Sequence, residues 1–103
     1  MAGIAFLVLA GGTDPTTHRT VLHTPDYDLT VVAVPSYAEA MAEARALYQA
    51  GIATIELCGG FGHQGAAAVA GAVPGAHVGV VRFDSHPGLN GQSGDIYFGT
   101  SKP

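Results

Sequence analysis

The apolar run IAFLVLA at residues 4–10 is the feature that most constrains how this chain can fold. It is continuously apolar instead of alternating with polar residues, which is typical of a strand in a parallel sheet that is covered on both faces. It is far shorter than the roughly 20 residues that cross a membrane, no basic segment precedes it, and it ends at Gly11 and Gly12. We therefore expect a buried strand and no membrane partner.

Three further apolar runs follow, and we expect them to form strands at residues 29–34, 52–58 and 76–83. Between the first two of these, Ser36 and Glu39 have the spacing of a capping box, and apolar residues recur at helical spacing up to Gly51. We expect a helix at residues 37–50 and a second helix, made of small residues, at residues 64–73.

The segment after the first run has two interpretations. Asp14 can cap a short helix that starts at Pro15 and runs to about Leu22. The β-branched residues of this segment favour a strand at residues 20–23 instead. The helix is the main expectation, and the strand remains the alternative.

The alternation of strands and helices predicts a parallel sheet with right-handed crossovers. We expect one α/β domain over residues 1–103, with a four-stranded, mainly parallel sheet in the order βαβαβαβ. Ligands of such doubly wound domains bind beyond the C-terminal ends of the strands. A ferredoxin-like α+β arrangement is the alternative if residues 20–23 form a strand. Residues 85–103 are expected to be a glycine-rich C-terminal loop or tail, with an aromatic end that docks on the domain or on a neighbour.

Composition limits the partners of the protein. Charged residues make up 12% of the chain and hydrophobic residues 48%, so we expect part of the surface to be covered in a homo-oligomer, most simply a dimer. A net charge of −4 and the lack of a basic cluster argue against nucleic acid. The single cysteine, Cys58, cannot form an internal disulfide, which suits the reduced cytoplasm.

The segment ELCGGFGH at residues 56–63 is the most informative in the chain. Strand alternation puts Glu56 and Cys58 on one face, and the glycines allow a tight turn into a helix whose first N–H groups can bind an anion. Cys58 can act as a nucleophile or an acid/base group, and His63 can transfer protons. An inert, buried cysteine is the structural alternative. The substrate-binding glycines are expected to be Gly59, Gly60 and Gly62.

Glu56 and Arg82 are charged residues inside two predicted strands. If these strands are neighbours, the two side chains can form a buried ion pair that only stabilises the sheet. The functional interpretation is that Glu56 is a general acid or base and that Arg82 binds a substrate carboxylate.

The loop after the fourth strand carries Asp84 and His86. Loops that follow neighbouring parallel strands open at the same edge, so these two side chains can join Cys58 and His63 in one catalytic pocket. His18, in the loop after the first strand, is a further candidate for binding substrate. The spacing of these residues matches no compact metal motif, and the glycine loop lacks the spacing of a dinucleotide fingerprint, so we expect neither a metal nor an organic cofactor.

The chain resembles a family of short, mostly bacterial proteins known as domain of unknown function 6506. The segment ELCGGFGH at residues 56–63 is the most specific part of the resemblance. Matching segments also include Asp14-Pro15 with His18-Arg19, residues 29–32, residues 79–84, and His86-Pro87-Gly88. The resemblance implies that these segments are the family's signature, and it implies no reaction.

Three interpretations of the function remain open from the sequence. The first is a small enzyme without an organic cofactor, of the isomerase, lyase, cyclase or hydrolase type, which acts on a small carbonyl or carboxylate compound. The second is a module that binds or senses a small anion without catalysis. In both cases the expected ligand is a small anionic molecule. A purely structural domain is the third possibility.

Overall fold

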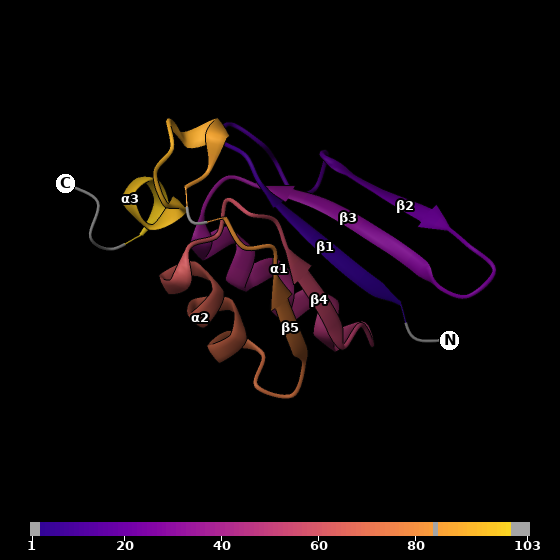
Figure 1. Ribbon diagram of the computed structural model, residues 1–103. Helices are drawn as coiled ribbons and strands as arrows, with labels where there is room; N and C mark the ends of the chain where they lie inside the picture. The colour runs from indigo at the N-terminus through magenta and orange to yellow at the C-terminus, as the bar shows by residue number, and fades with distance from the viewer. Residues whose placement is uncertain (1–2, 84, 100–103) are drawn as a thin grey trace.

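The computed structural model describes residues 3–83 and 85–99, and Figure 1 shows how the chain runs. In chain order the elements are β1 (Ile4–Leu9), β2 (Arg19–His23), β3 (Asp28–Val34), α1 (Tyr37–Gln49), β4 (Thr54–Leu57), α2 (His63–Ala72), β5 (His77–Val80), the 3-10 helix η1 (Pro87–Leu89) and α3 (Gly94–Phe98). None of the described helices is both long and apolar enough to span a bilayer.

The strands form one five-stranded mixed sheet in the order β2-β3-β1-β4-β5. Four of them, β3, β1, β4 and β5, are parallel, and they correspond to the four predicted apolar runs. β2 pairs antiparallel with β3 at one edge, with Arg19 opposite Val32 and His23 opposite Asp28. The carboxyl ends of the four parallel strands therefore meet at one edge of the sheet, which we call the carboxyl edge.

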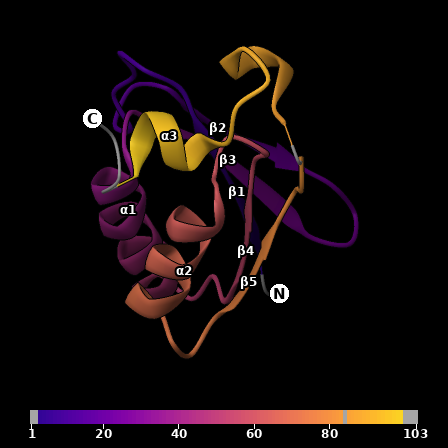
Figure 2. The ribbon, with the colours of Figure 1, turned by 60° about the vertical axis from the view of Figure 1, so that its left-hand side comes forward.

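Both long helices pack on the same face of the sheet, as Figure 2 shows. Ser36 caps α1 as expected, because its Oγ accepts a hydrogen bond of 3.1 Å from the backbone N–H of Glu39. After the helix, Gly51 has φ of 99°, a conformation that favours glycine at a helix stop. The core lies between sheet and helices, and its largest fully buried side chains are Phe61, Leu7, Ile55, Leu57, Val32, Val34 and Val69.

The structure corrects the expectation for the segment after β1. No helix covers residues 15–22, and the strand alternative is the right one, as β2. The backbone N–H groups of Thr17 and His18 donate to the Asp14 carbonyl, so the chain forms a tight turn there and then enters β2. The added strand makes the sheet five-stranded. The ferredoxin-like alternative is also wrong, because the four core strands are parallel.

A second difference concerns the faces of the sheet. The continuous apolar run of β1 predicts a strand covered on both faces, but α1 and α2 cover only one. Ala5 and Leu7 point into the core and are fully buried, whereas the alternate residues of β1, Ile4, Phe6 and Val8, are half-buried on the opposite side. We call that side the open face.

The described part of the C-terminal segment holds two short helices where a loop or tail was expected. Its aromatic end docks on the same chain, because the Phe98 ring lies 5.9 Å from the Tyr37 ring. Gly94 sits so close to the loop before α2 that a Cβ there would collide with the carbonyl oxygen of Gly60. The segment thus covers part of the carboxyl edge (Figure 1).

Candidate functional site

The loops after β4 and β5 meet at the carboxyl edge. A Cβ on Gly59 would overlap the ring of Phe83 and would lie 3.4 Å from Cδ2 of His86. The Phe83 and His86 rings pack against each other with centroids 4.8 Å apart. Nδ1 of His86 accepts a hydrogen bond of 3.0 Å from the Gly88 N–H, so a neutral His86 carries its proton on Nε2. The structure therefore brings Gly59 and His86 together, as expected for neighbouring parallel strands.

The N-terminal end of α2 holds a carboxylate that belongs to the chain itself. Both carboxylate oxygens of Asp95 accept a hydrogen bond of 3.1 Å from the backbone N–H of Gln64. The Tyr37 hydroxyl donates to the same carboxylate at 3.1 Å, and it accepts at 3.0 Å from the Gly62 N–H. We call these two donors to Asp95, the Gln64 N–H and the Tyr37 hydroxyl, the carboxylate cradle.

Glycines make this arrangement possible. A Cβ on Gly62 would collide with the Asp95 carboxylate, and a Cβ on Gly65 would collide with the Tyr37 ring. At the start of α2, where we predicted an anion site, the chain's own Asp95 carboxylate accepts the hydrogen bonds of the cradle. The negative group there is favoured by the helix dipole as well as by the hydrogen bonds.

Tyr37 is the most perturbed ionisable group of the cradle. Burial raises the pKa of Tyr37 to about 12, although the hydrogen bond from Gly62 opposes the shift, and the negative charges of Asp95 and Cys58 raise it further. The ring stacks on Phe61 with centroids 5.6 Å apart and is only 9% exposed as a residue. At neutral pH the hydroxyl is therefore protonated and acts as a hydrogen-bond donor.

Cys58 lies beside the cradle, at the end of β4. Its sulfur accepts a hydrogen bond of 3.2 Å from the Leu9 backbone N–H, and a Cβ on Gly60 would lie 3.5 Å from it. The residue is half-buried and also packs against the hydrophobic core. Cys58 lies between the carboxyl ends of β1 and β4, which is where the strand order reverses.

Several predicted site residues do not join this group. Glu56 is exposed on the open face of the sheet, because Ile55 and Leu57 point into the core. His63 is the first residue of α2 and is exposed to solvent. His18 lies in the turn before β2, where its Nδ1 accepts a hydrogen bond of 2.8 Å from the Asp14 N–H. Asp84 lies outside the described residues.

The expected buried pair of Glu56 and Arg82 is wrong. Both residues are exposed, and the described part of the chain has no buried charged residue. Arg82 follows the end of β5, where one of its guanidinium nitrogens donates to the Phe83 carbonyl at 3.2 Å. The strands are neighbours as predicted, but Glu56 lies opposite Gly79 in the register, three residues before Arg82.

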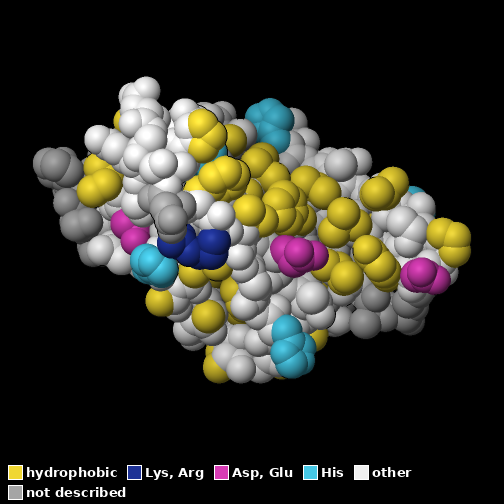
Figure 3. Space-filling view, viewed as in Figure 1, with side chains coloured by type: hydrophobic (Ala, Val, Ile, Leu, Met, Phe, Trp, Pro, Cys, Tyr) yellow, Lys and Arg dark blue, Asp and Glu magenta, His cyan; other side chains and the backbone are white. Residues whose placement is uncertain are grey.

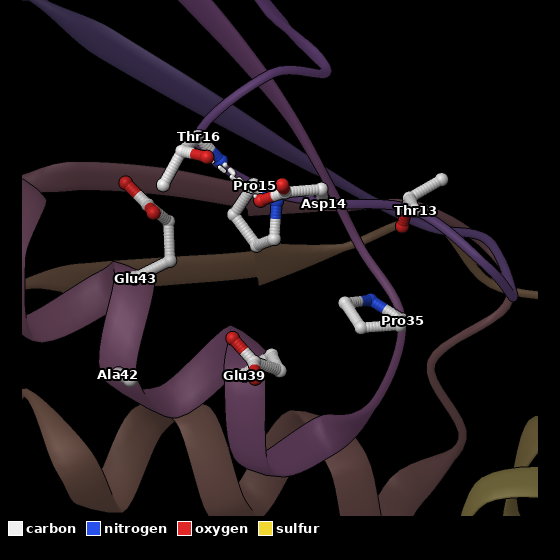
Figure 4. Close-up of a pocket in the computed structure, with 8 residues that line it drawn as sticks. All are labelled: Thr13, Asp14, Pro15, Thr16, Pro35, Glu39, Ala42 and Glu43. Atoms are coloured by element: carbon white, nitrogen blue, oxygen red, sulfur yellow. Dashed lines mark hydrogen bonds between the residues drawn. The ribbon is translucent and has the colours of Figure 1, made fainter.

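A separate acidic pocket of about 410 Å³ lies between the turn after β1 and the helix α1 (Figure 4). The Asp14 carboxylate in it is already used by the backbone and side chain of Thr16, and these hydrogen bonds lower the pKa of Asp14. Glu43 pairs with Arg19 at 3.2 Å. No group of three or more His, Cys, Asp or Glu side chains is close enough to hold a metal ion within residues 3–83 and 85–99.

An apolar cavity of about 600 Å³ adjoins the carboxylate cradle. It lies between α1, α2 and α3, and Tyr37 and Gln64 are its polar lining residues. Its apolar walls come from Met41, Ala67, Ala68 and Phe98. A mainly apolar cavity with polar groups at one end is the usual form of a small-molecule site.

Sequence reasoning missed Tyr37 and Asp95. Tyr37 was expected only as the first residue of a helix, and Asp95 lay in a segment without periodicity. The available signal was local: Ser93 precedes Gly94 and Asp95 with the pattern of a helix cap, and its hydroxyl does accept from the Asp95 N–H at 3.1 Å. The contact between Tyr37 and Asp95 spans 58 positions of the sequence, and no local pattern predicts it.

Comparison with known proteins identifies the family. The family model described as "Family of unknown function (DUF6506)" matches residues 2–96, and the chain belongs to this family. No curated protein and no solved structure matches the chain.

Proposed function

We propose that this member of the DUF6506 family binds a small carboxylate compound in the carboxylate cradle, and that Cys58 acts on it without an organic cofactor. The observation that carries the proposal is the hydrogen-bonded position of Asp95. The chain's own carboxylate at the N-terminal end of α2 is a model for how the carboxylate of a ligand would be held.

The donors of the cradle suit a carboxylate better than a cation or a neutral group. A backbone N–H and a phenol hydroxyl both point at the oxygens of Asp95, and the helix N-terminus adds a partial positive charge. With a pKa of about 12, Tyr37 keeps its proton at neutral pH, so its hydroxyl can donate a hydrogen bond to the ligand. The adjoining apolar cavity of about 600 Å³ can hold the rest of the compound.

Cys58 is the group we assign to the chemistry. Its sulfur accepts a hydrogen bond from the Leu9 N–H, and Cys58 lies close enough to Tyr37 to contribute to the raised pKa of that residue. A thiolate there can attack a carbonyl or remove a proton next to a carboxylate. His86 packs against Gly59 of the same loop, and we assign proton transfer to it.

Asp95 competes with such a ligand. A tethered group has an effective concentration of about millimolar or more, so a free carboxylate must displace it before it binds. Asp95→Ala empties the cradle, whereas Asp95→Asn keeps an acceptor oxygen there and is the matched control. Isothermal titration calorimetry with pyruvate, succinate and citrate should show at least one acid binding the alanine variant about ten-fold or more tighter than the wild type.

A second substitution shows where binding occurs. Tyr37→Phe in the Asp95→Ala background removes one of the two donors, so the gain in affinity should disappear. If Asp95→Ala binds none of the acids better than Asp95→Asn does, Asp95 is a helix cap only and the proposal is wrong.

Binding or sensing without catalysis is the second candidate, and two observations on the described residues favour it. The two donors that define the cradle are uncharged, and the sulfur of Cys58 bonds to the Leu9 N–H and not to Asp95. A metabolite screen for turnover separates the two functions. Loss of turnover in Cys58→Ala with unchanged carboxylate affinity supports the enzyme, whereas turnover that survives this substitution removes Cys58 from the mechanism. Carboxylate binding without turnover of any screened compound supports the binding module.

A further inference from the structure

The open face of the sheet is a broad apolar surface. Its centre consists of Ile4, Phe6 and Val8 of β1 with Leu29, Val31 and Ala33 of β3, which point away from the fully buried Leu7 and Val32. In Figure 3 hydrophobic side chains form a nearly continuous band across this view of the molecule. At its β2 edge, Leu22 is 57% exposed, more than any other large hydrophobic residue that the structure describes.

An uncovered face of this kind is unusual for parallel strands. Inner strands of parallel sheets are normally covered on both faces, which is why their sequences are continuously apolar. The run of β1 has that character, yet α1, α2 and α3 all lie on the other side of the sheet (Figure 2). The sequence of β1 therefore fits a strand whose second face is covered by something outside this chain's described residues.

The size of the face fits association between proteins. The five strands hold between four and seven residues each, and at about 4.8 Å between strands and about 3.3 Å per residue their projected area is about 400 Å². Two such faces present about 800 Å² in flat projection, and the accessible area of side chains exceeds their projection. The pair thus reaches the roughly 1,000 Å² that specific interfaces need, at the lower end of their range.

The charged residues of the open face indicate which kind of partner covers it. The strand residues of the open face include no Lys or Arg in the described chain, so the face lacks the groups that attract nucleic acid or anionic lipid. Its polar residues are Thr20 on β2, Thr54 and Glu56 on β4, and His77 on β5, so polar groups flank the apolar centre on both sides, as in a protein interface. A second copy offers the same apolar centre, which is the self-complementary surface that a two-fold interface requires.

We infer that the protein forms a homodimer through the open face, with the two sheets packed against each other about β1 and β3. Aligned sheets pack about 10 Å apart with their strands at about 30°. Phe6 and Val31 lie at the centre of the contact, Glu56 lies beside Phe6 on β4, and Leu22 lies at the β2 edge. The carboxylate cradle stays accessible on the helical side of each sheet.

Two neighbouring residues of β2 give a matched test. Leu22 faces the open side, whereas Val21 faces the helical side and is 42% exposed, so lysine at either position leaves the core intact. Sedimentation equilibrium of the full chain at about 100 µM should give twice the monomer mass of 10.4 kDa. Leu22→Lys should weaken the dimer about ten-fold or more, and Val21→Lys should change it less than about two-fold. Val31→Lys, at the centre, should leave a monomer.

Each result of these experiments supports or overturns the proposed dimer. A wild-type monomer at about 100 µM overturns the inference, because an interface of about 1,000 Å² should be populated at that concentration. A dimer weakened equally by Val21→Lys and Leu22→Lys also overturns it and indicates pairing through the edge of β2. If circular dichroism shows that Val31→Lys is unfolded, the comparison of Leu22→Lys with Val21→Lys alone decides.

Discussion

Removal of the Tyr37 hydroxyl should change both the stability of the protein and its dependence on pH. In Tyr37→Phe the Gly62 N–H loses its acceptor and Asp95 loses a donor, while the stacked ring remains. An unsatisfied buried group costs about 1 to 3 kcal/mol, so the free energy of unfolding at pH 7 should fall by about that amount. Urea denaturation followed by circular dichroism measures it.

The pH dependence follows from the raised pKa of Tyr37. Its value of about 12 in the folded state exceeds the unfolded value of 10.0, so the native state retains the proton more strongly. The stabilisation is fully present below pH 10 and is lost as the pH rises to about 12. A shift of this size corresponds to about 2 to 3 kcal/mol, so the advantage of the wild type over Tyr37→Phe should shrink across this range and nearly vanish at its upper end.

Tyr27→Phe is the control, because Tyr27 is exposed and no hydrogen bond of its hydroxyl holds a buried group in the described chain. This variant should lose stability between pH 10 and 12 in parallel with the wild type. The reasoning is refuted if Tyr37→Phe also runs parallel to the wild type across that range, because Tyr37 would then ionise as an ordinary exposed tyrosine.

Three further substitutions test the packing around the site. Gly94→Ala places a Cβ against the Gly60 carbonyl oxygen and should cost about 1 to 3 kcal/mol by urea denaturation, whereas Gly79→Ala, with no atom within 4 Å of the added Cβ, should cost less than about 1 kcal/mol. Asp95→Ala removes the cap of α2 and should lower the free energy of unfolding by about 2 kcal/mol, with Asp95→Asn less affected. Arg82→Met should cost less than about 1 kcal/mol because Arg82 is exposed; a cost of about 3 to 5 kcal/mol would restore the buried pair with Glu56.

The parts of the fold that local patterns determine were predictable. Each parallel strand corresponds to an apolar run, and α1 begins and ends where Ser36 and Gly51 indicate. β2 was predicted only as the alternative to a helix, because its strand conformation depends on pairing with β3 and the cap signal of Asp14 and Pro15 favoured the helix. Asp14 and Pro15 instead belong to a turn, in which the Asp14 carboxylate accepts a hydrogen bond from the Thr16 N–H.

The candidate site was predictable only as far as neighbouring strands determine it. Parallel order is enough to bring the loops that carry Gly59 and His86 together. It does not predict that α3 folds back over the carboxyl edge, so neither Asp95 nor its contact with Tyr37 could be inferred. For Glu56 the prediction was wrong in another way. Strand alternation correctly puts Glu56 and Leu57 on opposite faces of the sheet, but the face of Glu56 is the open face, away from the cradle.

Amide chemical shifts of the emptied cradle test the central claim most directly. In ¹H–¹⁵N spectra of Asp95→Ala, titration with succinate or pyruvate should shift the Gln64 and Gly62 N–H signals in a saturable manner, while the exposed Gly71 N–H signal, in the last turns of α2, stays in place. The same titration of Asp95→Asn should produce much smaller changes. If the Gln64 signal does not move with any of the acids, or moves only together with that of Gly71, the N-terminal end of α2 is not a carboxylate site.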